Sequence, residues 1–526
     1  MLRFMQRFVL LAGLLLATAA FAAAQNPSQD AGLKAGATTA PAAGEHSGLP
    51  DKERRDAQNA QGGATTAAAP GAARAQNAAA VDFDKLSEEA TGWLSGLLAI
   101  NTTNPPGNEL AAAKYIAAIL EKEGITAEVI ESAPGRGIVI ARLRAGTMPD
   151  PSRALLLLGH TDVVGVDRAK WTTEPFGGAV KDGAIWGRGA IDDKGRMVAS
   201  LAAFVGLKRA GVRLDRDVIF LAEADEEEGG EAGIEFAVRN HWDKIAAGFA
   251  LNEGGRMFVK DGKAVYVGVQ ASEKVPVNIE VIATGPAGHA SIPRDENAVV
   301  HLAAAVAKIG GYDAPVQLNS VTRRYFEQLA TLEAPETAKW IRALLEQPER
   351  LQNAAKRLSE MNPVWNAMLR NTVAPTILRG GVRSNVIPSE ARATVNIRLL
   401  PGETPTALIA ELNKLINDPQ VRIELATSLR QPAPASSLDT EFYRVIEQVT
   451  PTFYPGAIVV PQMSTWATDS AQLRLRSVQA YGIIPFPLTE EEIARMHSDD
   501  ERLPVAAFRK GVEYMFRIIE AFVRAK

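Results

Sequence analysis

Three short clusters of acidic and histidine residues, each following a strand-like or turn-like apolar stretch, constrain this sequence most strongly. They are Gly159-His160-Thr161-Asp162, Ala190-Ile191-Asp192-Asp193-Lys194-Gly195 and Asp225-Glu226-Glu227-Glu228-Gly229-Gly230. So much negative charge beside buried segments requires a cation to neutralise it. Histidine and carboxylate side chains suit zinc and similar metal ions. The clusters therefore predict a site for a pair of metal ions, with one carboxylate to spare.

The composition is that of an ordinary globular protein and excludes several classes of site. The chain has 526 residues, 46% of them apolar and 22% charged, which is enough for two or more domains. A net charge of −4 gives no electrostatic attraction to nucleic acid, so no nucleic-acid partner is expected. The absence of cysteine excludes disulfides, thiolate nucleophiles and cysteine-based zinc sites.

Residues 1–24 have the pattern of a signal peptide. Arg3 and Arg7 form a short basic region, and residues 8–24 are uncharged, rich in Leu and Ala, and end in small residues that suit cleavage. The alternative is an uncleaved membrane anchor, because this stretch has the lower limit of spanning length. In either case we expect the body of the protein to be exported, periplasmic or secreted, with membrane contact only through an uncleaved segment.

Residues 25–80 are rich in Ala, Gly, Thr, Gln and Pro and contain almost no aromatic or branched residues. Such a segment cannot bury enough apolar surface to offset the entropy lost on ordering. The sequence therefore predicts a disordered tether that precedes the folded part.

From residue 81, predicted strands alternate with predicted helices. The predicted helices of the first part (81–272) span 84–100, 110–123, 194–210 and 233–241, and the strands span 138–142, 155–158, 218–222 and 248–251. This alternation predicts an α/β fold with a mostly parallel central sheet and helices on both faces. Functional residues of such sheets lie at the carboxyl ends of strands, where the three clusters lie.

A second predicted domain interrupts the first. Residues 273–431 contain strands at 277–284, 392–399 and 421–425 and helices at 297–309 and 404–416, which indicates a small α+β lid domain. A helical insertion at about 315–370 divides it, and no pocket can be read from the sequence of this insertion. Residues 432–526 return to the first domain with helices at 438–450 and 504–523.

Each cluster also has a structural explanation. Asp162 lies two residues after His160, so both side chains share a face, and a carboxylate there fixes the imidazole tautomer for metal binding. The alternative is a turn histidine bonded to Asp162. Asp193 can cap the helix that follows, which leaves Asp192 free. The Glu226–Glu228 run can be a solvated surface, but it abuts an apolar strand and precedes two glycines.

Five motifs occur together in one order along the chain. They are Gly159-His160-Thr161-Asp162-Val163-Val164, Gly187-Arg188-Gly189-Ala190-Ile191-Asp192-Asp193-Lys194-Gly195, Asp225-Glu226-Glu227, Gly288-His289-Ala290-Ser291-Ile292-Pro293 and Met496-His497-Ser498-Asp499-Asp500-Glu501. Over residues 84–526 the chain resembles the M20 family of metallopeptidases, which includes glutamate carboxypeptidase and aminoacylase. Leu251-Asn252-Glu253-Gly254-Gly255 and the helical insertion resemble the branch of yeast carboxypeptidase S and the secreted N-acyl-amino-acid hydrolases.

The resemblance implies two zinc ions per chain that share Asp192 as a bridging ligand. It implies that His160 binds one ion and that His497 and Glu227 bind the other. It further implies that Glu226 is the general base, that Asp162 orients His160, and that the peptide bond between Asp192 and Asp193 is cis. A base beside two dications has the chemistry needed for amide hydrolysis.

The chain departs from the family pattern at the remaining ligand. The nearest branch has the Asp of an Asp-Glu-Gly-Gly sequence there, and this chain has Asn252. An amide oxygen is a weaker ligand than a carboxylate. Either Asn252 binds through its oxygen, Glu253 replaces it, or that metal is held less tightly. The position-for-position match favours Asn252.

Three further residues match substrate-binding positions of the family. The resemblance implies that His289 stabilises the oxyanion, supplied in dimers by the lid of the partner, and that Asn385 and Arg398 contact a substrate carboxylate. A guanidinium fork binds a carboxylate through two parallel hydrogen bonds. The alternatives are a turn histidine for His289 and a surface strand residue for Arg398.

The resulting hypothesis is an exported zinc hydrolase, a monomer or homodimer, that cleaves a peptide or N-acyl amide bond next to a free carboxylate. The substrate is then a small peptide or an N-acyl amino acid. One alternative is a dipeptidase or aminopeptidase, which anchors the amine of its substrate. The other is a catalytically silent peptide-binding protein on the same scaffold, which only Asn252 favours.

Overall fold

The computed structural model describes residues 80–146, 150–426 and 431–525. All of them belong to the compact unit Ala75–Lys526. The predicted signal peptide and residues 25–79 of the predicted tether lie outside the described residues. No helix within the described part is long and apolar enough to cross a membrane.

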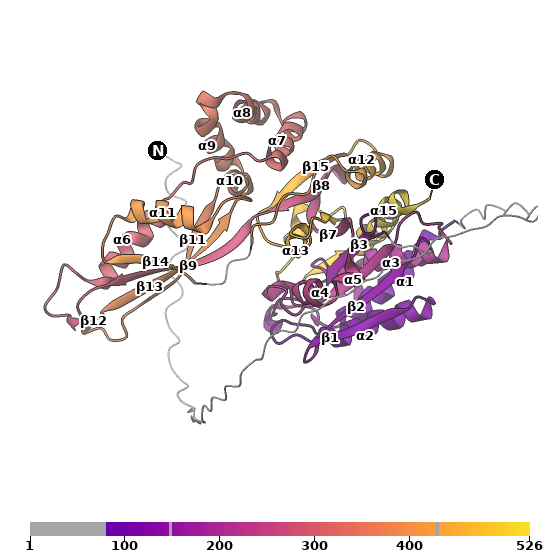
Figure 1. Cartoon of the computed structure of the whole chain (residues 1–526), viewed down its shortest axis with the longest axis horizontal. Helices are drawn as coiled ribbons and strands as arrows, with labels where there is room; N and C mark the ends of the chain where they lie inside the picture. The colour runs from indigo at the N-terminus through magenta and orange to yellow at the C-terminus, as the bar shows by residue number, and fades with distance from the viewer. Residues whose placement is uncertain (1–79, 147–149, 427–430, 526) are drawn as a thin grey trace, which may run out of the picture. The chain divides into compact units, whose positions relative to one another are not determined.

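A central eight-stranded sheet forms the first domain (Figure 1). In spatial order its strands are β1 (Ala127–Ala133), β2 (Arg136–Leu143), β6 (Val218–Glu223), β3 (Leu155–His160), β7 (Phe249–Lys260), β16 (Gln479–Ile484), β8 (Lys263–Glu273) and β15 (Ile458–Ser464). Four neighbouring pairs are parallel: β3 with β6, β3 with β7, β16 with β7, and β15 with β8. The fold is therefore α/β with a mixed, mostly parallel sheet, as the sequence predicts.

Helices cover both faces of this sheet. On one face pack α1 (Phe83–Leu98), α2 (Glu109–Lys122), α3 (Lys194–Arg209), α12 (Glu441–Phe453) and α15 (Val505–Val523); on the other pack α4 (Ile234–Asn240), α5 (Trp242–Ile245) and α13 (Ser470–Arg474). Leu155 and Leu157 join the first core, whereas Leu156 and Leu158 join the second. Because alternate side chains of a strand point to opposite faces, a run of four leucines requires cover on both sides.

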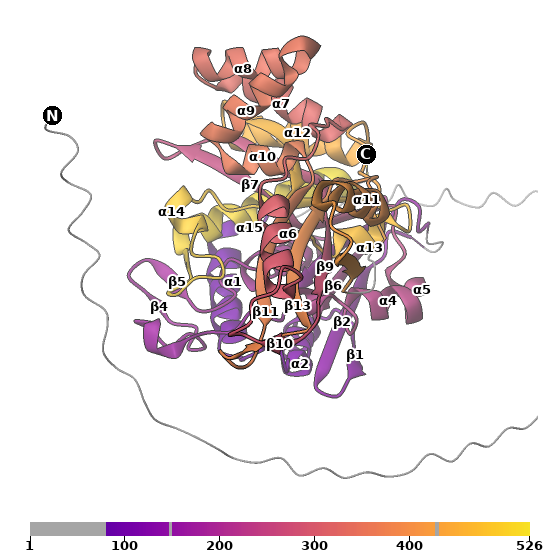
Figure 2. The ribbon, with the colours of Figure 1, turned by 90° about the vertical axis from the view of Figure 1, so that its left-hand side faces the viewer.

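The lid domain is a four-stranded antiparallel sheet backed by two helices. Its strand order is β11 (Thr372–Gly380), β13 (Glu390–Leu399), β9 (Val275–Thr284) and β14 (Val421–Leu425). The helices α6 (Ala298–Gly310) and α11 (Pro405–Ile416) pack against this sheet (Figure 2), and each contributes buried apolar side chains to a core shared with it. Every second residue of β13 is buried, which is the pattern of a sheet with one covered face. A separate two-stranded pair joins β10 (Gly288–His289) to β12 (Val386–Ile387).

The helical insertion folds as α7 (Ser320–Leu332), α8 (Pro335–Glu346), α9 (Leu351–Met361) and α10 (Pro363–Leu369). Tyr325, Phe326 and Trp365 of this insertion are buried in the same core as the first face of the central sheet. The insertion thus divides the lid in sequence but packs on the first domain.

Smaller elements complete the first domain. A three-stranded sheet joins β17 (Arg502–Pro504), β5 (Ala184–Trp186) and β4 (Val180–Lys181), and α14 (Glu490–Ile493) precedes β17 in the chain. The sequence-based prediction missed β1, β8 and β11, and it also missed β15 and β16 of the central sheet, because residues 451–503 were read without strands. It also ended a strand at residue 251, whereas β7 continues to Lys260 and turns back into β8.

Candidate metal centre

The first and third clusters meet because they follow neighbouring parallel strands. His160 ends β3 and lies opposite Glu223, the last residue of β6. The chain then turns at Asp225, which has a left-handed backbone (φ 74°), into a short 3₁₀ turn, Glu226–Glu228. An aspartate tolerates this conformation better than most residues. The turn places Glu226 and Glu227 at the edge of the sheet where His160 lies.

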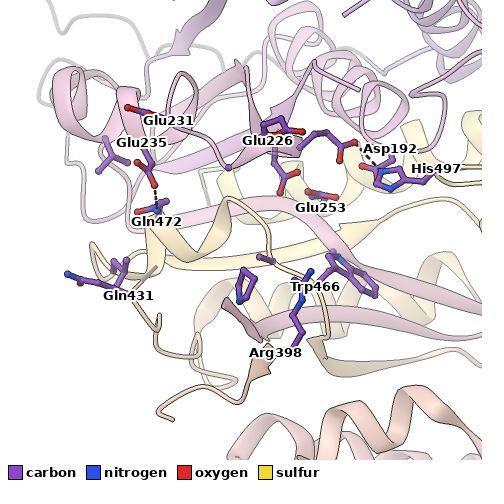
Figure 3. Close-up of a pocket in the computed structure, with 18 of the residues that line it drawn as sticks. Asp192, Glu226, Glu231, Glu235, Glu253, Arg398, Gln431, Trp466, Gln472 and His497 are labelled. Atoms are coloured by element: carbon purple, nitrogen blue, oxygen red, sulfur yellow. Dashed lines mark hydrogen bonds and ion pairs between the residues drawn. The ribbon is translucent and has the colours of Figure 1, made fainter. Parts of the chain in front are cut away.

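Asp192 lies between two histidines that are distant in the sequence. Its Oδ1 is 3.2 Å from Nε2 of His160, and its Oδ2 is 3.1 Å from Nε2 of His497. Figure 3 shows the side chains of Asp192 and His497 beside each other. The peptide bond between Asp192 and Asp193 is cis, as the resemblance implies. The two oxygens of one carboxylate thus face different imidazoles, which is the arrangement of a bridging ligand.

Two groups of ligand atoms surround Asp192. One consists of His160, Asp192 and Glu253, and the other of Asp192, Glu227 and His497; within each group the ligand atoms lie within 4.8 Å of one another. Oε1 of Glu227 is 3.1 Å from Nε2 of His497, and Oε1 of Glu253 is 3.9 Å from Nε2 of His160. The described residues therefore place His160, Asp192, Glu227 and His497 together, as the sequence predicts.

Glu253 occupies the position for which the sequence favoured Asn252. The amide of Asn252 donates a hydrogen bond to Oγ of Ser470 at 3.2 Å, whereas Glu253 joins the group around His160. A β-bulge explains the exchange, since residues 253–255 of β7 lie opposite the single residue 483 of β16. Gly254 permits the bulge with φ of 135°, and a Cβ there would lie only 2.1 Å from the Gln270 side chain. A bulge redirects side chains, so position-for-position matching chose the wrong neighbour.

The electrostatics of the cluster show a strong demand for positive charge. Burial lowers the pKa of His160, but its hydrogen bonds with Asp162 and Asp192 outweigh this and raise that pKa well above its usual value. Hydrogen bonds with Asp192 and Glu227 raise the pKa of His497 to about 10. Burial, and then the charge of Asp192, raise the pKa of Glu253 well above its usual value. Neutral histidines carry no charge that could balance the clustered carboxylates. The site therefore favours the binding of cations.

Glu226 belongs to neither ligand group but lines the same cavity. Burial raises the pKa of its carboxyl group well above the usual value; His160 opposes this rise, and Asp469 and Glu227 add to it. Figure 3 shows Glu226 and Glu253 along one wall of the cavity. A carboxyl group with a raised pKa next to a candidate metal pair is suited to accept and release a proton.

Asp162 connects His160 to the turn that carries Glu226 and Glu227. Nδ1 of His160 lies 3.4 Å from Oδ1 of Asp162, and the backbone amides of Glu226 and Glu227 each donate to the Asp162 carboxylate at 3.2 Å. The Asn104 amide donates to the same carboxylate at 2.8 Å. Asp162 is fully buried, so this single side chain positions groups from both strand ends.

A buried polar network also holds Asp225, the residue at which the chain turns toward Glu226 and Glu227. Asn104 also donates to Asp225 at 3.0 Å, and Arg136 bridges Asp225 at 2.8 Å and Glu109 at 2.7 Å. Sequence reasoning missed Asn104, Glu109 and Arg136. Their only signal was the Asn104-Pro105-Pro106-Gly107 loop and a charged residue at the start of a helix, which many chains share.

Glu501 holds the loop that carries Asp192. Its carboxylate accepts hydrogen bonds from Nη1 of Arg188 at 2.7 Å and from the backbone amides of Gly189, Ile191 and Asp192 at 3.0, 2.8 and 3.3 Å. Both charged side chains are buried. Glu501 lies four residues after His497, so the same segment supplies a candidate ligand and positions the bridging one. The sequence marked Glu501 only as part of the motif around His497.

Asp193 does not cap α3 with its side chain, contrary to the capping alternative. Its two oxygens instead accept hydrogen bonds from Nε and Nη2 of Arg196 at 2.8 and 2.9 Å. Arg196 also donates to the carbonyl oxygen of Leu158 at the end of β3. Asp193 thus ties the beginning of α3 to the strand that carries His160.

Four of the candidate ligands line a cavity of about 1300 Å³ to which residues of the lid domain also contribute, namely Asp192, Glu227, Glu253 and His497. Arg398 and Asn396 of β13 line it, together with Trp466 of the loop after β15. Figure 3 shows Arg398 and Trp466 across the cavity from Glu226 and Glu253. His289 and Asn385 are exposed and are not among the described residues that line the cavity. The described chain therefore brings Arg398 to the site, and the roles of His289 and Asn385 stay predictions.

The family model for peptidase family M20/M25/M40 matches residues 156–521. This match covers well over half of the chain and includes both groups of candidate ligands. The chain belongs to this family. It is an enzyme of the metallopeptidase and amidohydrolase type. One solved structure with the same fold, that of the Bacillus subtilis YXEP protein, is described as a dinuclear metal binding peptidase of the M20 family; it is 14% identical, with a TM-score of 0.53 and coverage of 83% and 98%. This confirms the family, fold class and enzyme type that the sequence predicts.

Two relatives and one solved structure illustrate the similarity. The chain is 31% identical over 377 residues to the probable carboxypeptidase S-like 2 of Dictyostelium discoideum. This alignment covers 70% of this chain and 71% of that protein. It is 29% identical over 378 residues to the human N-fatty-acyl-amino acid synthase/hydrolase PM20D1, covering 70% and 74%. The M20 family metallo-carboxypeptidase Sso-CP2 of Sulfolobus solfataricus has the same fold, with a TM-score of 0.62, 18% identity, and coverage of 84% and 99%.

Proposed function

We propose that this protein is a di-zinc hydrolase that cleaves a peptide or N-acyl amide bond next to a free carboxylate. The observation that carries the proposal is the position of Asp192, whose two oxygens face His160 and His497 in two groups of candidate ligands. The separate carboxyl group of Glu226 supplies the proton acceptor that hydrolysis requires.

The residues present fit a pair of zinc ions. Each group offers one imidazole and two carboxylates, which are ligands that zinc accepts, and the shared Asp192 joins them. We propose that His160, Asp192 and Glu253 hold one ion and that Asp192, Glu227 and His497 hold the other. Two bound dications would lower the pKa of a water molecule and polarise the substrate carbonyl.

In this proposal the protein's own residues position the substrate and move the proton. The Glu226 carboxylate accepts the proton of the attacking water and then donates it to the leaving nitrogen. Asp162 holds the backbone of Glu226 and the ring of His160 so that neither has to reorient during the reaction. Arg398, across the cavity, binds the free carboxylate of the substrate through its guanidinium fork.

The main alternative, an aminopeptidase or dipeptidase, anchors the amine of the substrate instead. Arg398 and Asn396 on the lid wall favour a carboxylate, since a guanidinium cannot bind an ammonium group. The carboxypeptidase and N-acyl-amino-acid hydrolase names of the two relatives favour the same choice.

The test is a hydrolysis assay with matched substrates and metal analysis. An N-acyl amino acid with a free carboxylate should be hydrolysed, and its carboxamide should be hydrolysed far more slowly. Arg398→Ala should raise KM for the substrate with the free carboxylate. It should also reduce the difference in hydrolysis rate between that substrate and its carboxamide. Preference for amino acid amides with a free amine would support the aminopeptidase, and zinc binding without hydrolysis of any substrate would support the silent binding protein.

We further propose that the protein is exported. This rests on the basic, apolar and small-residue pattern of residues 1–24, which lie outside the described residues. N-terminal sequencing of protein recovered from the periplasm or medium should begin near residue 25. Recovery of the full chain in the cytoplasm would contradict export, and an uncleaved chain in the membrane fraction would support the anchor.

A further inference from the structure

The lid sheet turns its uncovered face toward the metal-site cavity. Along β13 and over residues 275–280 of β9, every second side chain belongs to the core shared with α6 and α11, and the residues between them are partly exposed. Because alternate residues of a strand share a face, these partly exposed residues lie on the face that the helices leave uncovered. Four of them line the cavity, namely Pro276, Asn278, Asn396 and Arg398.

Three polar side chains on this face form a hydrogen-bonded row. Nε of Arg398 donates to Oδ1 of Asn396 at 3.2 Å, and Nδ2 of Asn396 donates to Oδ1 of Asn278 at 2.9 Å. Asn278 lies directly opposite Asn396 in the antiparallel pair of β13 with β9, so the second bond joins the two strands. The two bonds require the same orientation of the Asn396 amide, since a flipped amide would set its NH2 group against Nε of Arg398.

This row determines which edge of the Arg398 guanidinium receives a ligand. A guanidinium has five N–H donors in a fixed plane. Asn396 takes the donor on Nε, so the donors on Nη1 and Nη2 have to bind a carboxylate end-on. A planar group with two oxygens matches two parallel donors, whereas a carboxamide places its NH2 group against one of them. The row therefore favours a free carboxylate over an amide.

The next pair on the same face limits where an anionic group can lie. Thr394 is opposite Glu280, and its hydroxyl group donates to Oε1 of Glu280. Neither of them is among the described residues that line the cavity. The negative charge of Glu280 repels a carboxylate, so an anionic group is favoured at the Arg398 end of the face.

We propose that Asn396 is a positioning residue for substrate recognition, which holds Arg398 so that both of its Nη atoms face the free carboxylate of the substrate. This inference rests on the proposed function and deepens it, because it makes the selectivity for a carboxylate depend on two side chains rather than on Arg398 alone. An arginine side chain rotates about several bonds, and a guanidinium held in place binds more tightly than one that must first be ordered. The cross-strand bond to Asn278 keeps Asn396 itself in place.

The test measures kcat and KM of the zinc-loaded full-length enzyme for N-acetyl-phenylalanine and for its carboxamide. Asn396→Leu has nearly the same shape as the wild type and removes both hydrogen bonds of the Asn396 amide. Thr394→Val is the matched control, because it removes a cross-strand hydrogen bond on the same face that does not reach Arg398. Arg398→Ala and the double variant with Asn396→Leu complete a double-mutant cycle. Thermal unfolding of every variant checks that it folds.

Asn396→Leu should raise KM for the carboxylate substrate by about tenfold or more, the effect of losing a hydrogen bond to a charged group. Its kcat, its KM for the carboxamide, and both KM values of Thr394→Val should stay within about twofold of the wild type. In the Arg398→Ala background, Asn396→Leu should have no further effect, because no guanidinium is left to hold. An unchanged KM, an equal rise for both substrates, or the full effect in the Arg398→Ala background would overturn the positioning role.

A binding measurement separates failure of this inference from failure of the proposed function. Calorimetric titration with N-acetyl-phenylalanine and its carboxamide uses Glu226→Gln as a common background, so that turnover does not interfere. If Asn396→Leu weakens binding of the carboxylate alone while the wild type hydrolyses neither compound, the positioning role stands and the proposed hydrolysis fails. If the wild type hydrolyses the carboxylate substrate and Arg398→Ala raises its KM but Asn396→Leu does not, only the positioning role fails.

Discussion

The carboxylate of Asp162 accepts a hydrogen bond from the backbone amide of Glu226 at 3.2 Å. The same side chain lies 3.4 Å from the ring of His160. The orientation of a candidate metal ligand and the position of the candidate base therefore depend on one buried group. Because Asp162 accepts from several donors at once, its charge matters as well as its shape.

Asp162→Asn should lower kcat/KM by about tenfold to a hundredfold, since the new amide nitrogen would face the backbone donors of Glu226 or Glu227. Steady-state kinetics with metal quantitation would measure this. Asp167→Asn, at an exposed aspartate that caps a short 3₁₀ turn, is the control and should change neither quantity. Wild-type kinetics in Asp162→Asn would show that the hydrogen bonds to Asp162 are dispensable.

Glu226→Gln should lower kcat by about 10²–10⁴-fold while the metal content stays that of the wild type, because glutamine cannot accept the proton of the water. Glu228→Gln removes the same charge from an exposed neighbour in the same turn and serves as the matched control. Retained turnover in Glu226→Gln would refute the role of general base, and lost metal would make Glu226 a ligand instead.

Glu253→Gln should release the metal ion that His160 binds, and Asn252→Ala should retain both ions. The reason is that Glu253 lies in the ligand group while the amide of Asn252 bonds to Ser470. Metal analysis after dialysis against a weak chelator distinguishes the two. The opposite pattern, with metal lost only in Asn252→Ala, would restore the assignment that the sequence favoured.

That these candidate residues lie together was largely predictable from the sequence, because most of them follow strands. Parallel strands end at one edge of a sheet, so clusters after the apolar runs 155–158 and 218–222 had to lie close together. His497 does not follow a predicted strand, so only its sequence motif identified it as a candidate ligand. The positions of strand ends therefore carried most of the prediction, and family resemblance supplied the rest.

The errors arose where side-chain direction depends on tertiary structure. The choice between Asn252 and Glu253 turns on a bulge between β7 and β16, which no pattern within β7 reveals. Asp193 looked like a helix cap because capping is local, but Arg196 can reach it one turn later. The partners Asn104, Arg136 and Glu501 come from distant segments, and single charged residues give no signal of such contacts. A cavity of about 400 Å³ lies between the insertion and the central sheet, and its shape depends on how aromatic residues of α7 and α10 pack against β7 and β8, which the sequence does not reveal.

Glu501→Gln should lower the free energy of unfolding by about 3–5 kcal/mol, because it leaves the buried Arg188 guanidinium without its counter-charge. Urea unfolding would measure this. Glu174→Gln is the matched control, since Glu174 pairs with Arg168 in an exposed ion pair worth about 1 kcal/mol or less. Equal losses in the two variants would show that the Arg188–Glu501 pair contributes no more than a surface pair.

Lys274, at the junction of β8 and β9, should make stability depend on pH. Burial, and then the charge of Arg398, lower its pKa to about 7, while its amine donates to the carbonyl oxygens of Ala367 and Arg370. An unfolded lysine keeps a pKa of about 10.4, so between these values the unfolded state binds the extra proton and stability rises with pH. The free energy of unfolding of the wild type relative to Lys274→Met should therefore increase by about 2 kcal/mol from about pH 7 to about pH 9. Lys414→Met, at an exposed lysine of α11, should show no such change in the same urea titrations. A difference between wild type and Lys274→Met that is constant over this range would mean that Lys274 stays protonated in the folded protein.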